Sequence, residues 1–408
     1  MLRFLLALCA VVVIALSGSV TTASAAPESG MRSRFDLRVD ALPRASLVTL
    51  PPKELVDPSR QRGARIVTDV QQSLFFVWAA AQIFAFGWLW RSGNAARLRD
   101  WLRRRLRNVR VVRIAFGAIL GAYAPLAALP FAFIRYRVGF NVGLTDEIIG
   151  AWLVRYALTM CTDALLTALV VVVVLELVDR TRLWYLAFTV FLFAITIGIA
   201  GIDPLVSART GHDVATPIAA SVPVERATTS RKTMSARVAG LGDLTRIIVG
   251  QPLLSAATAP ELGYVLAHED AHVAHRDVLK VTLMWTTLLV LACVLAVLIS
   301  DRIGFRRDDD VLSRLALVGA FLGGAALLIF PLYNGYARGI EYRADEDARQ
   351  RLSDPSAAIR FLVRRADDDM VTLCERRSSS WYFADHPALG SRIAAMRGSE
   401  DPCPRYGH

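Results

Sequence analysis

Long apolar stretches separated by short polar segments dominate the pattern along this chain. A transmembrane helix needs about 20 mostly apolar residues to cross the hydrocarbon core of a bilayer. Uncharged stretches of about that length lie at 73–90, 114–134, 183–202, 281–300 and 315–337, and a sixth, near 152–175, carries Asp163. The pattern predicts a mostly α-helical, multi-pass membrane protein with six spans.

The first 25 residues follow the order expected of a secretory signal peptide. Arg3 provides a basic start, an apolar run extends from Phe4 to Leu16, and small residues follow at 23–25. The alternative is an uncleaved membrane anchor, which would be a seventh span. After it we expect an N-terminal membrane region with four spans at 26–205 and a second domain at 206–408, which includes a two-span hairpin at 281–337.

Composition agrees with a membrane protein, since 54% of the residues are hydrophobic and only 20% are charged. A soluble globule could not bury that much apolar surface. The net charge of +11 comes mostly from arginine, and a basic balance attracts either nucleic acid or anionic lipid. No nucleic-acid recognition motif accompanies the charge, so we expect a lipid bilayer and no nucleic acid as partner.

Arginine placement predicts the orientation in the cytoplasmic membrane, because short arginine-rich loops stay on the cytoplasmic side. The segment after the first span holds Arg91, Arg97, Arg99, Arg103, Arg104, Arg105, Arg107, Arg110 and Arg113. Counting spans from there places 203–277 and 338–408 on the extracytoplasmic face, as the N-terminal signal also does. Cys374 and Cys403 share the second of these regions, and we expect them to pair in an oxidising compartment.

The polar segment before the fifth span contains a metal-binding pattern. His268, Glu269 and His272 form H-E-x-x-H in a helix-compatible stretch. Histidines four residues apart share one helix face and can bind one cation, and Glu269 then lies where it can take a proton from a water on the metal. The pattern predicts one zinc ion per chain, and zinc then needs a third protein ligand.

Two carboxylates after the span hairpin can complete this site. Glu341 and Asp345 are four residues apart, so they share a face of one helix. The hairpin returns both to the membrane face of His268. Glu341 is the predicted third zinc ligand, and Asp345 is predicted to hold a ligand imidazole by a hydrogen bond.

With these motifs the chain resembles the type I CAAX prenyl endopeptidases and their bacterial membrane-protease relatives. These are gluzincin zinc metallopeptidases, with H-E-x-x-H and a distal glutamate. The resemblance covers most of the chain after about residue 50, and residues 206–408 correspond to its zinc metallopeptidase domain. It is carried by Leu55–Pro58, Val222–Val224, Ala239–Gly242, Arg246–Val249, Glu261–Asp277, Asn334–Asp345, Asp385–Pro387 and Arg392-Ile393.

The resemblance implies a small β element beside the zinc helix and a strand edge, near Met234 to Gly240, that binds an extended peptide by main-chain hydrogen bonds. Ser235 and Ala236 stand where the family has Asn-Ala. It also implies that His386 is a catalytic residue and that His386 and Arg392 bind the substrate or stabilise the oxyanion, since a donor aimed at developing negative charge lowers the barrier.

The favoured interpretation is a membrane-embedded zinc metalloendopeptidase that hydrolyses membrane or exported proteins. One alternative is a catalytically silent, chaperone-like binding protein, although the retained Glu269 speaks against it. Another is a cytosol-facing protease of the CAAX-processing type. A transporter is suggested by the many spans and by Asp163, because a carboxylate within a span usually faces water or the bundle interior.

Overall fold

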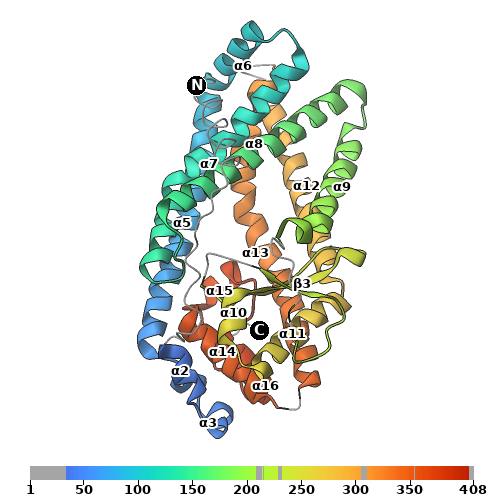
Figure 1. The fold of residues 1–408 in the computed structure, drawn as a ribbon. Coiled ribbons are helices and arrows are strands. Elements are labelled where there is room, and N and C mark those ends of the chain that lie inside the picture. The colour runs from blue at the N-terminus through green and yellow to red at the C-terminus, as the bar shows by residue number, and fades with distance from the viewer. Residues whose placement is uncertain are drawn as a thin grey trace.

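The computed structural model describes residues 34–207, 214, 216–227, 232–304, 310–352 and 354–403. The predicted signal peptide or anchor at 1–25 lies outside these residues. In the described part, helices fill one elongated body, and a small sheet lies near one of its ends (Figure 1). The predicted mostly α-helical class with a small β element is confirmed.

Among the described residues, six helices are long and apolar enough to cross a membrane, as the hydrophobic pattern predicted. Each predicted stretch lies almost entirely inside one helix. In chain order the helices are α5 (Pro58–Arg91), α7 (Val109–Asn141), α8 (Ile149–Arg180), α9 (Trp184–Ser207), α12 (Asp277–Gly304) and α13 (Val311–Arg351).

Helices α7 and α8 pack closely because Gly121 has no side chain. A Cβ at Gly121 would lie 2.6 Å from the backbone oxygen of Asp163 and 2.7 Å from Thr167. Small residues allow this approach of two backbones, and close packing supplies much of the attraction between helices in a membrane. Gly121 therefore fixes the level at which Asp163 faces the bundle.

Two of the long helices extend beyond the bundle to the polar end of the molecule. The first turns of α5 are polar, and Arg60 and Gln61 there donate hydrogen bonds to backbone carbonyls of residues 366–371. Helix α13 has 41 residues, and its last turns carry Glu341 and Asp345. These helices join the membrane region to the polar end and hold the candidate metal ligands beside it.

The polar end consists of a sheet and several short helices around one core. The sheet has the order β1-β3-β2, with β1 (Val224–Ala227) parallel and β2 (Ala236–Ala239) antiparallel to the central β3 (Arg246–Gly250). Its buried core includes Ile247 of β3, Leu266, Ile359 and Ile393. The other elements here are α2 (Arg34–Asp40), α3 (Arg44–Thr49), α4 (Pro52–Leu55), η1 (Gly242–Leu244), α10 (Gln251–Ala256), α11 (Ala259–Ala274), α14 (Ser356–Asp368), α15 (Arg377–Phe383) and α16 (Leu389–Arg397).

Two features of the fold bear on orientation. The middle of the arginine-rich segment forms the short helix α6 (Asn94–Arg105), which lies at the end of the bundle opposite the sheet, α11 and α16 (Figure 1). Cys374 and Cys403 form a disulfide with a Cα–Cα distance of 5.2 Å. The predicted pairing is confirmed, and it lies at the end away from α6.

Candidate metal centre

The candidate site is built on α11, whose start is determined by its sequence. Glu261 accepts the backbone N–H of Thr258 in a capping box, and Pro260 occupies the first turn, where its missing N–H is not needed. Most of the helix is buried, including His268. The face shared by His268 and His272 turns toward the last turns of α13.

Three side chains that could bind a metal ion meet between α11 and α13. His268 Nε2 and His272 Nε2 lie 3.2 Å apart, and Glu341 places carboxylate oxygens 3.2 Å and 3.4 Å from them. Ligands held tetrahedrally at about 2.0–2.1 Å from a zinc ion lie about 3.3–3.4 Å from one another. The 3.2 Å distance is from His268 Nε2 to Glu341 Oε2, and the 3.4 Å distance is from His272 Nε2 to Glu341 Oε1. These three side chains are thus close enough together to hold one tetrahedral zinc ion and leave its fourth position open.

The chemistry of the three groups also favours a cation. Glu341 Oε2 is buried and accepts no hydrogen bond of good geometry from the described residues, although His268 Nε2 lies 3.2 Å away. Lone pairs that converge on one point repel each other unless a proton or a metal ion lies between them. Two imidazoles and one carboxylate form a donor set used by catalytic zinc sites.

Each imidazole has a carboxylate behind it, and that of His272 forms a hydrogen bond with Asp277. His268 Nδ1 lies 3.0 Å from Asp345 Oδ1, and His272 Nδ1 lies 3.0 Å from Asp277 Oδ2. Such partners leave Nε2 directed at the metal. The predicted contact of Asp345 is present, but sequence reasoning missed Asp277, which Arg343 holds at 2.6 Å. The signal available was a carboxylate five residues after His272.

Arg392 is buried and pairs with Asp345 behind His268. Its side chain is 3% exposed and donates to both oxygens of Asp345, at 2.8 Å and 2.7 Å, and to the Tyr264 hydroxyl at 3.1 Å. Arg392 is thus buried on the far side of Asp345 from the candidate ligands, and its predicted role in binding substrate or stabilising the oxyanion stays a prediction. Arg392 neutralises the carboxylate that orients His268.

His386 reaches the site from a loop after α15. Its Nε2 lies 3.4 Å from Glu341 Oε2, Nδ1 lies 2.8 Å from Asp385, and the side chain is 47% exposed. Arg338 and Asn334 of α13 donate to backbone carbonyls of residues 380–384. These bonds hold the loop so that an accessible imidazole faces the metal ligands.

Glu269 is buried, with 7% of its surface exposed, and it follows His268 directly on α11. Burial lowers the pKa of His272, but hydrogen bonds to Asp277 and Glu341 and the charge of Glu269 outweigh burial and raise that pKa to about 10. The carboxylate of Glu269 is therefore close enough to act on the ligand set electrostatically.

Ser235 directly precedes β2 and Ala236 begins it; β2 is the edge strand that contacts α11, the helix of His268 and His272. The Ser235 carbonyl accepts the Gly250 N–H at 2.8 Å, and Ala236 pairs with Val249 of β3. On its other side β2 pairs with no strand among the described residues. An edge of this kind offers main-chain hydrogen bonds to an extended chain.

Comparisons with known proteins agree with this arrangement. The model of peptidase family M48 matches residues 208–400, which include all the candidate ligands. The chain is 28% identical over 173 residues to a protein named Protease HtpX homolog from Janthinobacterium sp. (strain Marseille), which covers 38% of this chain and 58% of that protein. The uncharacterized metalloprotease YhfN of Bacillus subtilis (strain 168) is 22% identical over 378 residues, 86% of this chain and 88% of its own length.

A solved structure has the same fold. The crystal structure of S. mikatae Ste24p superposes with a TM-score of 0.61 at 16% identity, and the match covers 90% of this chain and 99% of that chain. At this identity the likeness concerns the fold, which is that of a multi-pass membrane protein.

Proposed function

We propose that the chain is a zinc-dependent membrane endopeptidase with His268, His272 and Glu341 as metal ligands. The observation that supports this most strongly is that the His268 and His272 Nε2 atoms lie 3.2 Å apart and each lies 3.2–3.4 Å from one oxygen of the Glu341 carboxylate. The family match and the protease names of the relatives support the same reaction class.

In this proposal zinc, when bound, supplies Lewis-acid chemistry, polarising the scissile carbonyl and making water acidic near neutral pH. Glu269 takes the proton of the attacking water and passes it to the leaving amine. His386 is the accessible donor that faces the negative charge developing on the carbonyl oxygen. The edge of β2, from Ser235 and Ala236, binds the substrate backbone as an added strand.

The test compares zinc-loaded wild type with Glu269→Gln on unfolded casein in detergent micelles. We expect Glu269→Gln to keep its zinc and lose at least about 100-fold in rate, the scale of general acid–base catalysis. Glu346→Gln is the matched control, because Glu346 is 47% exposed and, within the described part of the chain, bonds to its neighbours Arg349 and Gln350. Equal turnover in wild type and Glu269→Gln would refute the role of Glu269.

The same test separates the main alternative. If the wild type binds zinc and casein but neither the wild type nor any variant cleaves casein, a catalytically silent binding protein is the better interpretation. Casein is a generic chain, so wild-type turnover would establish the reaction class and leave the natural substrate to be identified.

We further propose that the site faces the extracytoplasmic side, so that membrane or exported proteins are the substrates. The arginine-rich helix α6 and the metal site lie at opposite ends of the bundle (Figure 1), and the disulfide lies at the metal end. A cysteine at exposed Ser399 should react with an impermeant maleimide in intact cells. A cysteine at exposed Arg107 should react only after permeabilisation. The reverse pattern would favour a cytosol-facing processing protease.

A further inference from the structure

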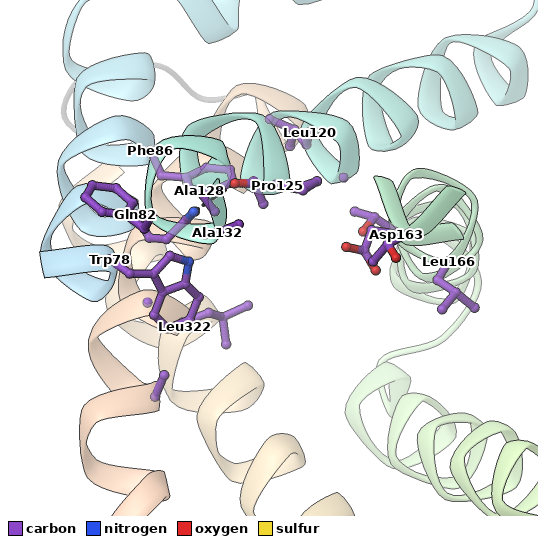
Figure 2. A pocket seen from close by; sticks show the side chains of 18 of the residues that line it. Trp78, Gln82, Phe86, Leu120, Pro125, Ala128, Ala132, Asp163, Leu166 and Leu322 are labelled. Atoms are coloured by element: carbon purple, nitrogen blue, oxygen red, sulfur yellow. Dashed lines mark hydrogen bonds between the residues drawn. The ribbon is translucent and has the colours of Figure 1, made fainter. Parts of the chain in front are cut away.

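A cavity of about 1350 Å³ lies among the spanning helices (Figure 2), and none of the three candidate metal ligands lines it. Helices α5, α7, α8 and α13 supply most of its lining, with Trp78, Leu120 and Leu322 among the apolar side chains. Sites for small molecules usually measure about 300–1,000 Å³. The size and the apolar lining favour a longer apolar ligand over a small polar metabolite.

Four charged side chains line this cavity, and one of them, Asp163, is apart from the others. Arg155 and Glu147 bind each other at 2.7–2.8 Å. Asp163 is eight residues beyond Arg155 on α8, about 12 Å along the axis. It lies level with Gly121 on α7, and Arg135 is fourteen residues further along that helix, about 21 Å away.

The carboxylate of Asp163 faces the open cavity, across from Trp78 and Gln82 (Figure 2). No side chain in the described ranges donates a hydrogen bond to it, and Gln82 uses its amide N–H on the Ala124 carbonyl at 2.8 Å. A carboxylate at membrane depth costs free energy unless it is paired or hydrated. Asp163 therefore offers a half-buried negative charge to a ligand cation.

The cavity reaches the strand edge assigned above to substrate. Thr233 lines it, and the neighbouring Lys232 N–H bonds the Leu144 carbonyl at 3.0 Å. Met234 and Ser235 follow Thr233 in the chain, and β2 begins at Ala236. A polypeptide added along β2 could continue past Thr233 into the cavity.

We propose that the cavity receives an apolar segment of the polypeptide substrate, and that Asp163 binds a lysine or arginine side chain within that segment. This inference rests on the proposed function. Gly323 packs against Gln82 across from Asp163, and Glu341 follows eighteen residues later on α13, about 27 Å away. The bound basic residue is thus about eight extended residues or more from the cut bond.

The test measures binding of a fluorescent 20-residue leucine–alanine peptide with one central lysine to the full chain in lipid nanodiscs. Zinc is removed so that no cleavage intervenes, and the comparison peptide carries glutamine in place of lysine. We expect wild type to bind the lysine peptide about tenfold more tightly. Asp163→Asn should bind both peptides equally, at the affinity of wild type for the glutamine peptide.

The matched control is Asp179→Asn, the same change on the same helix at a residue that is 56% exposed. It should keep the tenfold preference for lysine. Equal affinities in wild type, or a preference that survives in Asp163→Asn, would overturn the inference. Since this assay needs no turnover, a wild type that cleaves casein but shows no lysine preference refutes only this inference and leaves the proposed function standing.

Discussion

The clearest quantitative prediction concerns Asp345→Asn. Asp345 is 3% exposed and accepts hydrogen bonds from Arg392 at 2.7 Å and 2.8 Å and from Tyr264 at 3.0 Å, while His268 Nδ1 lies 3.0 Å away. The substitution keeps the shape of the side chain but removes its charge. We expect it to affect two properties, the stability of the polar end and the orientation of His268, one of the proposed zinc ligands.

The magnitudes follow from these contacts. Arg392 is itself 3% exposed, and a buried charge left without its partner costs about 3–5 kcal/mol of stability. Loss of a carboxylate behind a ligand imidazole lowers metal affinity about 10–100-fold. We therefore expect a lower melting temperature and, at temperatures where the variant is still folded, weaker zinc binding.

The assay is zinc competition against a chromogenic chelator at 10–15 °C, with tryptophan fluorescence reporting the folded fraction. Tyr264→Phe is the matched control, because it removes one hydroxyl that donates to Asp345 and leaves both charges in place. It should cost about 1 kcal/mol of stability and leave zinc affinity nearly unchanged. A folded Asp345→Asn with wild-type zinc affinity would refute the argument that Asp345 orients His268.

Three further predictions test the fold. Gly121→Ala should destabilise the bundle by about 1–3 kcal/mol, because its Cβ would lie 2.6 Å from the Asp163 carbonyl oxygen. Gly139→Ala on the same helix should be neutral, since its Cβ would have no neighbour closer than 4.0 Å. Equal melting temperatures for the two variants would contradict this packing. The Cys374–Cys403 bridge joins residues 29 apart in the sequence, and its reduction should lower the free energy of unfolding by about 3–4 kcal/mol. Free alkylation of both thiols in a non-reduced preparation would show that the bridge is absent. Burial raises the pKa of Asp369 from 3.8 to about 6, so the folded state binds a proton at this carboxyl more tightly than the unfolded state does. The contribution of the protonated carboxyl to the stability of the fold is complete below about pH 4 and is lost as pH rises through about 6. Asp369→Asn keeps an acceptor for the Met234 N–H and should melt higher than wild type above pH 6 but not near pH 4; a melting-temperature difference independent of pH would count against this assignment.

The sequence by itself determined the local elements. Apolar stretches long enough to cross a bilayer predicted all six spanning helices of the described residues, since the hydrophobic requirement is a property of consecutive residues. The four-residue spacing of His268 and His272 fixed their common helix face for the same reason. Glu341 and Asp345 could be found because they repeat this spacing after a span hairpin that returns the chain to one side.

Tertiary structure decided which side chains meet across the chain. Asp277 lies beside His272, and Arg392 is buried against Asp345, which precedes it by 47 residues in the chain. The level of Asp163 in the bundle follows from the approach of α8 to Gly121 on α7. Periodicity along the sequence describes the faces of single helices, but these contacts depend on how several helices pack, and the packing is set by side-chain volume and charge pairing over the whole molecule.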